Sequence, residues 1–159
     1  MSIAILKEDE IPKIQKIIPD NLNIELNVSC PNLKHNLVNT GIACFLNDKR
    51  KWCIIKLSPL EKSETIDNYY NMGFKQFHVC NTLPSTRGGI SGKVLEPYTN
   101  KHIDYIKSNY EDATIIAGGG VTTKNDALNY IERGASYVSV STLCFNPYSF
   151  IKFYLSMKN

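Results

Sequence analysis

The chain has 159 residues, enough for one domain with a sizeable core, and its 43% hydrophobic and 21% charged residues are ordinary for a globular protein. The net charge of +3 is small and scattered along the chain, which argues against binding to nucleic acid. No apolar run approaches the length of a membrane span, and the amino-terminal residues lack the pattern of a signal peptide. Five cysteines without paired spacing predict a reducing, cytoplasmic setting. The histidines show no metal-ligand spacing, so no metal site is predicted. The whole chain, residues 1–159, is predicted to form one domain.

Short apolar segments rich in β-branched residues alternate with segments of helical periodicity along the whole chain. Strands are predicted at residues 2–6, 22–28, 52–58, 75–81, 113–120 (ending in a glycine turn) and 135–142. Helices are predicted at residues 7–18, 37–48 (the weakest), 61–73, 95–110, 122–134 and 147–159. This alternation is typical of an α/β protein with a parallel sheet. About six βα units, where a complete (β/α)8 TIM barrel has eight, predict an incomplete barrel.

Polar residues come directly after the predicted strands. In parallel α/β folds, ligands bind at the carboxyl ends of the strands, so these residues are candidates for one common site. They are Asn27 to Asn32 (NVSCPN), Lys56 and Ser58, Asn81 and Thr82, Gly118 to Gly120, and Ser141 and Thr142.

Cys30 is the candidate for chemistry in the first of these clusters. A free cysteine is most often a small buried apolar residue, and this is our interpretation of Cys44, Cys53 and Cys144. Cys30 differs because asparagines and a serine surround it at the end of a strand. A thiol in such a setting can act as a general base.

Three further side chains have both a structural and a functional interpretation. Lys56 lies in an apolar strand, where it either extends its ammonium to solvent from the strand end or faces a ligand that gains negative charge. Asn81 and Thr82 either cap a turn or present hydrogen-bonding groups to a ligand.

Two glycine-rich stretches could approach a ligand through their backbone. The loop at residues 87–93 (RGGISGK) is not a Walker A motif, because Arg87 stands where the first glycine should be. It is either a flexible loop or a close contact to a flat ligand. The stretch at residues 115–126 (IIAGGGVTTKND) is predicted to contain the end of a strand, a glycine turn and the start of a helix, an arrangement that favours a phosphate site. It does not match the dinucleotide-binding motif.

Taken together, these motifs resemble the dihydroorotate dehydrogenase family of flavin-dependent (β/α)8 barrels. The matching segments are IELNVSCPN, IIKLSP, CNTLPSTRGGISGKVLEP, IIAGGGVTTKNDA and YVSVST, in the family's order and over nearly the whole chain. The resemblance implies an enzyme of pyrimidine biosynthesis that oxidises dihydroorotate to orotate with FMN. Dihydropyrimidine dehydrogenase has a related barrel, so another pyrimidine remains an alternative substrate.

The resemblance also implies roles for individual residues. Cys30 matches the catalytic base of the class 1 enzymes, and Lys56 matches a lysine that stabilises the anionic reduced flavin. The residues that match the pyrimidine-binding positions are Asn27, Asn32, Asn81 and Thr82. The other cofactor positions are Cys80 and Gly92 for the flavin, and Gly119, Gly120, Ser141 and Thr142 for its phosphate.

The sequence departs from the family pattern in two ways. Ser141 replaces the family's usual glycine, and the chain corresponds to strands 3 to 8 of the barrel. An open sheet would expose its edges, so we expect poor solubility, self-association or an amino-terminal chain that completes the barrel. The alternative function is a non-catalytic remnant or binding module. The electron acceptor, whether fumarate, NAD or quinone, is left open.

Overall fold

The computed structural model describes residues 1–5, 7–28, 40–80, 82–86 and 88–158. Its strands are β1 (Ser2–Ala4), β2 (Ile24–Asn27), β3 (Cys53–Lys56), β4 (Gln76–Val79), β5 (Leu83–Ser85), β6 (Gly88–Ile90), β7 (Thr114–Ala117) and β8 (Tyr137–Val138). Its α-helices are α1 (Ile11–Ile17), α2 (Ser63–Asn71), α3 (Glu96–Asn109), α4 (Lys124–Glu132) and α5 (Pro147–Lys158). Short 3-10 helices are η1 (Glu8–Glu10), η2 (Thr40–Phe45), η3 (Lys93–Leu95) and η4 (Thr142–Phe145).

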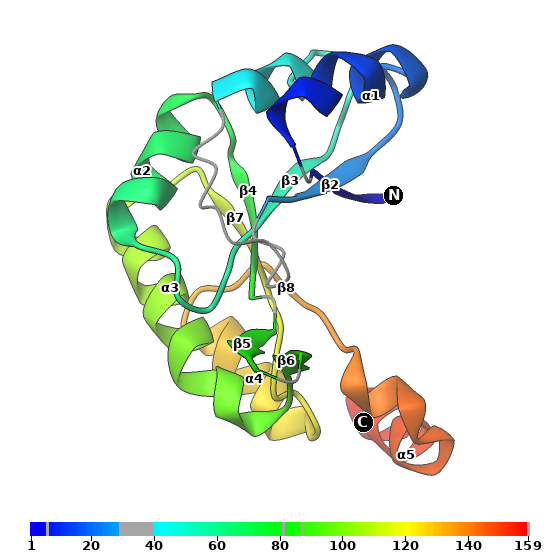
Figure 1. Ribbon diagram of the computed structural model, residues 1–159. Helices are drawn as coiled ribbons and strands as arrows, with labels where there is room; N and C mark the ends of the chain where they lie inside the picture. Colours follow the sequence, from blue (N-terminus) through cyan, green and yellow to red (C-terminus); the bar gives the residue numbers. More distant parts are fainter. Residues whose placement is uncertain (6, 29–39, 81, 87, 159) are drawn as a thin grey trace.

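Six strands form one parallel sheet in the order β1-β2-β3-β4-β7-β8. Each pair of neighbours in the order is joined by a connection that contains helical turns, as parallel pairing requires. The predicted α/β class and incomplete barrel are confirmed, and β1 and β8 are the open edges of this sheet. Figure 1 shows α2, α3 and α4 along one side of the sheet, α1 near β2 and β3, and α5 apart from the sheet.

The strands bury every second residue, as the two-residue period of a strand requires. The buried set faces the helices and forms the core: Ile24, Leu26, Cys53, Ile55, Phe77, Val79, Ile115 and Ala117. The alternate set lies on the inner face of the sheet and keeps partial contact with solvent: Glu25, Asn27, Ile54, Lys56, Gln76, His78, Thr114 and Ile116.

The inner face is concave. The rings of Trp52, just before β3, and Tyr137, on β8, meet edge to face with their centroids 5.6 Å apart. They meet although β4 and β7 lie between β3 and β8 in the sheet. The sheet therefore curls like part of a barrel wall.

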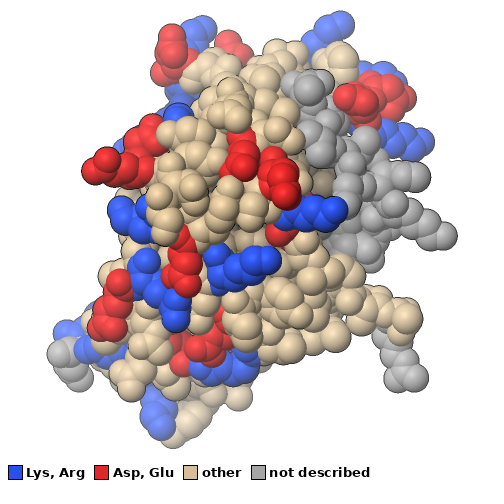
Figure 2. Space-filling model, turned by 90° about the vertical axis from the view of Figure 1, so that its left-hand side faces the viewer, with Lys and Arg blue, Asp and Glu red and all other residues tan. Residues whose placement is uncertain are grey.

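The outer surface of the helices is the solvent side of the domain. Figure 2 shows acidic and basic side chains interspersed over this face, consistent with the scattered charge of the sequence. The carboxyl-terminal helix α5 differs, because none of its residues is buried, and in Figure 1 it lies away from the sheet.

Three predicted elements differ from the observed ones. Residues 40–45 of the predicted helix 37–48 form the 3-10 helix η2, which contains two poor helix formers, Thr40 and Gly41. Residues in and just before the glycine-rich loop form the antiparallel hairpin of β5 and β6. The strand predicted at 135–142 is only Tyr137–Val138. The amide of Ser139 still donates to the carbonyl of Ala117 on β7, and the chain then leaves the sheet, so that Ser141 and Thr142 line a pocket.

Candidate functional site

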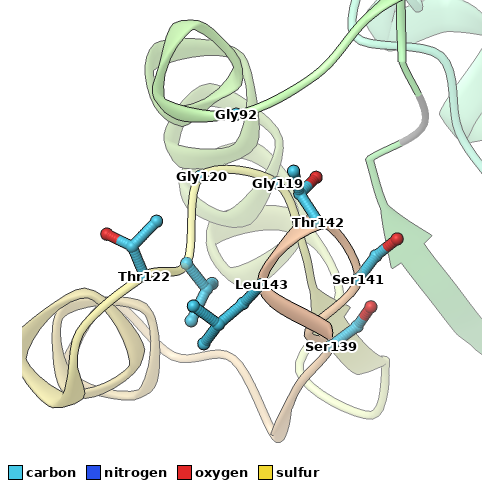
Figure 3. A pocket seen from close by; sticks show the side chains of 9 residues that line it. Gly92, Gly119, Gly120, Thr122, Ser139, Ser141, Thr142 and Leu143 are labelled. Atoms are coloured by element: carbon cyan, nitrogen blue, oxygen red, sulfur yellow. The ribbon is translucent and has the colours of Figure 1, made fainter. Parts of the chain in front are cut away.

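A pocket of about 140 Å³ lies at the carboxyl ends of β7 and β8. Three segments form it: the residue before η3, the turn between β7 and α4, and the residues from β8 into η4. Figure 3 shows the side chains of Ser139, Ser141 and Thr142 on the opposite side of the pocket from Thr122. The lining residues are Gly92, Gly119, Gly120, Val121, Thr122, Ser139, Ser141, Thr142 and Leu143. The structure therefore brings together these predicted cofactor positions: Gly92, Gly119, Gly120, Ser141 and Thr142.

The glycine turn packs directly on the segment around η3. Gly119 and Gly120 have φ angles of +86° and +76°, which side chains rarely adopt. A Cβ on Gly119 would lie 2.8 Å from the Cβ of Leu95, and one on Gly120 would lie 3.2 Å from the Cα of Lys93. Packing therefore requires these two glycines independently of any ligand.

The pocket has donors suited to an anion. In the described part of the chain, the backbone amides of Gly119, Gly120 and Ser141 donate to no protein acceptor. Gly120 is buried, Gly119 is half-buried and Ser141 is exposed. Neighbouring backbone amides that point into one pocket are a common form of anion-binding site. The hydroxyls of Ser139 and Thr142 add neutral donors at the same pocket.

The amino terminus of α4 is not one of these donors. Thr123 is the N-cap in a reciprocal capping box with Asp126, and the amides of Thr122 and Thr123 both donate to Asp126 Oδ2 at 2.8 Å. Lys93 also binds this carboxylate. Burial alone would raise the pKa of Asp126, but these hydrogen bonds lower it well below its usual range. The pocket is therefore lined by the glycine turn and by residues from β8 into η4, while Asp126 takes the amides of Thr122 and Thr123.

Cys80 lies at the end of β4 but its thiol faces the core. The sulfur is 3.1 Å from the hydroxyl of Thr99, which in turn donates to the carbonyl of Gly118. Burial raises the pKa of the Cys80 thiol, so it remains protonated. A flavin contact by Cys80 would have to come from its backbone.

Asn27 and Lys56 are neighbours in register at the carboxyl ends of β2 and β3. Both lie on the inner face, as ligand-binding side chains of a barrel do. The Lys56 ammonium lies 3.5 Å from a carboxylate oxygen of Glu25, on the same face. Lys56 therefore does not extend to solvent from the strand end but forms an ion pair inside the curve of the sheet.

Of the four remaining predicted site residues, the structure describes one. Thr82 follows β4 and packs against the hairpin, because its side chain fills the space in which a Cβ on Gly89 would lie. Cys30, Asn32 and Asn81 lie outside the described residues.

A family model described as dihydroorotate dehydrogenase matches residues 46–153. The chain belongs to the dihydroorotate dehydrogenase family. It is 28% identical over 167 residues to a dihydroorotate dehydrogenase B (NAD+) catalytic subunit of Petrotoga mobilis, a match that covers 88% of this chain and 55% of the relative. It is 30% identical over 158 residues to the corresponding subunit of Staphylococcus carnosus, covering 81% of this chain and 50% of the relative.

Solved structures of this family share the fold. The dihydroorotate dehydrogenase of Eimeria tenella, in a crystal structure with ferulenol, superposes with a TM-score of 0.73 at 23% identity. The match covers 94% of this chain and 53% of that one. The chain thus spans about half the length of the relatives it matches, in agreement with a sheet of six strands.

Two classes of feature are absent from the described part of this family member. None of its helices has the length and apolar character to cross a bilayer. Its described histidine, cysteine and carboxylate side chains form no cluster that could hold a metal ion.

Sequence reasoning missed two inner-face residues, Glu25 and His78. Glu25 stands inside an otherwise apolar strand, and this is a signal that an ionised partner lies opposite. His78 lies in a similar strand two positions before Cys80, but its partner is distant in sequence. Only the pairing of strands brings these two side chains together.

Proposed function

We propose that this chain forms the FMN-binding and pyrimidine-binding wall of a dihydroorotate dehydrogenase that oxidises dihydroorotate to orotate in pyrimidine biosynthesis. The observation that carries the proposal is the pocket at β7 and β8. It gathers five predicted cofactor positions around backbone amides that have no acceptor among the described residues.

The residues present fit a phosphate group. The pocket of about 140 Å³ corresponds to the space of a few water molecules, at about 30 Å³ each. Gly119, Gly120 and Ser141 would donate backbone hydrogen bonds to the phosphate, and Thr142 would add its hydroxyl. Ser141 is compatible with this role, because its backbone amide remains available although the family usually has glycine there.

We assign the substrate to the inner face beside Lys56. Bound FMN would supply the acceptor for a hydride from the substrate. Cys30 would remove the proton from the adjacent carbon, so that loss of the proton and of the hydride leaves the C=C bond of orotate. Lys56 would place positive charge near the ring that gains electrons. Four side chains would orient the pyrimidine: Asn27, Asn32, Asn81 and Thr82.

The phosphate site can be tested separately from the rest. Ser141→Asp places a negative charge in the pocket, and we expect FMN to bind about tenfold more weakly, because like charges in a half-exposed site repel by roughly 1–2 kcal/mol. Riboflavin, which has no phosphate, should bind equally to both forms. The neutral Ser141→Asn is the matched control. Equal FMN affinity in all three proteins would place the phosphate elsewhere.

The redox function requires a second experiment. Dihydroorotate added without oxygen should bleach the visible flavin band of the FMN-loaded chain. The bleaching should stop in Cys30→Ala and continue in Cys144→Ala, whose thiol is exposed and distant from the pyrimidine positions in sequence. Bleaching that persists in Cys30→Ala would exclude Cys30 as the base.

A second candidate function is a non-catalytic binding module, or a chain that acts only when another chain completes the barrel. The open edges β1 and β8 and the half-length match favour this candidate. A purified chain that binds FMN but is not reduced by dihydroorotate would support it. Restoration of reduction by a separate amino-terminal barrel fragment would identify the missing partner.

A further inference from the structure

A cluster of ionisable side chains occupies the inner face outside the pocket. Glu25, on β2, is its centre, with a side chain that is 17% exposed. Its Oε1 accepts a hydrogen bond from the hydroxyl of Ser2 on β1 at 2.8 Å and lies 3.5 Å from the ammonium of Lys56 on β3. Its Oε2 lies 2.6 Å from Nδ1 of His78 on β4. One carboxylate thus contacts side chains from three other strands.

The partners of Glu25 keep it ionised. Burial alone would raise its pKa, but the hydrogen bond and charge of His78, together with Ser2 and Lys56, lower the pKa to about 2. A carboxylate that is ionised at every physiological pH is a permanent negative charge in the concave face. It therefore attracts the Lys56 ammonium in every functional state.

The cluster holds Lys56 in one place. Glu25 is opposite Ile54 in the register, so the Lys56 side chain reaches it diagonally across the inner face. Lysine loses more rotamer freedom than most residues when it is fixed. An ammonium that is fixed before a ligand arrives makes binding less costly, which is the general advantage of preorganisation.

His78 connects this cluster to the pocket. It is directly opposite Lys56 in the register of β3 and β4. A Cβ on Gly118 would lie 3.1 Å from Nε2 of His78 and 3.2 Å from the hydroxyl of Ser139, which lines the pocket. The absence of a side chain at Gly118 thus leaves room for the imidazole between Glu25 and the wall of the pocket.

We propose that Glu25 is a positioning residue, which fixes the ammonium of Lys56 on the inner face beside the cofactor, and that His78 holds the Glu25 carboxylate in the orientation this requires. The inference rests on the proposed function, since it concerns the lysine assigned to the cofactor. Glu25 itself touches neither substrate nor cofactor and acts through Lys56.

The restraint can be measured without any cofactor. In ¹⁵N spectra, a fixed and ion-paired lysine ammonium exchanges protons slowly and gives a resolved signal, which Lys56→Gln would assign by its disappearance. We expect this signal to be present in the unmodified chain and in the exposed control Glu64→Gln, and to be lost in Glu25→Gln. A Lys56 signal that survives in Glu25→Gln would overturn the proposal.

The effect on the cofactor is measured by a double-mutant cycle. Glu25→Gln should weaken FMN binding about tenfold, which corresponds to about 1.4 kcal/mol. In the Lys56→Gln background, the same change should alter FMN binding less than about twofold, because the residue through which Glu25 acts is absent. Equal losses in both backgrounds would mean that Glu25 only supports the fold, and the proposal would fail.

The two proposals can fail separately. If the unmodified chain binds no FMN, the proposed function is wrong, while the ammonium signal still decides whether Glu25 fixes Lys56. If FMN binds and Glu25→Gln leaves both its affinity and the ammonium signal unchanged, the proposed function stands and the positioning role is wrong. His78→Gln should reproduce the loss of the Lys56 signal in weaker form.

Discussion

Side chains on the outer face of the sheet, such as Ile55 and Phe77, are fully buried under the helices, whereas Glu25, Lys56 and His78 on the inner face keep contact with solvent. The outer face is stabilised by burial of apolar surface, which is effective as soon as a helix covers a strand. The inner face is held by ion pairs, which contribute little to stability while water reaches them. The comparison teaches that the outer face carries most of the stability of this domain, whereas the inner face holds its ionisable side chains within reach of solvent.

Removing a large side chain from each face should show the difference in stability between the two faces most clearly. Phe77→Ala on the outer face should lower the free energy of unfolding by about 3–5 kcal/mol, because it leaves a cavity in a closed core. Ile116→Ala on the inner face should cost less than half as much, since that residue is only partly buried. Urea unfolding followed by circular dichroism measures both. If both variants lost the same free energy of unfolding at several protein concentrations, the inner face would be covered by other protein in solution.

Acid should weaken the inner face specifically. The folded pKa of Glu25 is about 2, against 4.5 for an unperturbed glutamate, so its stabilising contribution is complete above pH 4.5 and is lost as the pH falls toward 2. We expect a loss of about 1–2 kcal/mol over this window, less than the pKa difference alone implies because solvent screens the site. The difference in the free energy of unfolding between the unmodified chain and Glu25→Gln, followed against pH, separates the contribution of Glu25 from that of Asp126. Parallel acid profiles for the two proteins would contradict the assignment.

The capping box at the start of α4 lies outside the sheet and should have a smaller, local effect. Thr123→Ala removes the hydroxyl that accepts from the Asp126 amide at 3.2 Å and should cost about 1 kcal/mol. Thr123→Ser retains the acceptor and should recover most of this loss. Thermal unfolding of the three proteins provides the measurement, and identical midpoints would show that the Thr123 hydroxyl does not stabilise α4.

The smallest effect is expected on the exposed face of α5, a helix with no buried residue. Ile151 on α5 is 57% exposed, so Ile151→Ser should change the free energy of unfolding by less than about 0.5 kcal/mol. The same substitution at Ile103, fully buried on α3, is the control and should be severely destabilising. A large loss at Ile151, measured by urea unfolding, would indicate that α5 is buried in an assembly.

The family, the succession of βα units and the glycine turn that lines the pocket could be predicted from sequence, because they depend on local motifs. Alternating apolar segments specify the βα units, and glycines with positive φ mark the turn at Gly119 and Gly120. The length of β8 could not be predicted, because Val140 to Thr142 have the composition of a strand but leave the sheet, where Ser141 and Thr142 line the pocket.

The sequence by itself determined an α/β chain of six βα units with polar residues at the carboxyl ends of its strands, because patterns of two and 3.6 residues are local properties. Only the tertiary structure decided that Asp126 takes the amides of Thr122 and Thr123, just before α4, and that the Cys80 thiol faces the core. It also decided that Glu25, Lys56 and His78 form one cluster. These three residues are distant in the chain, and the register of parallel strands, which no local pattern encodes, places them within contact distance.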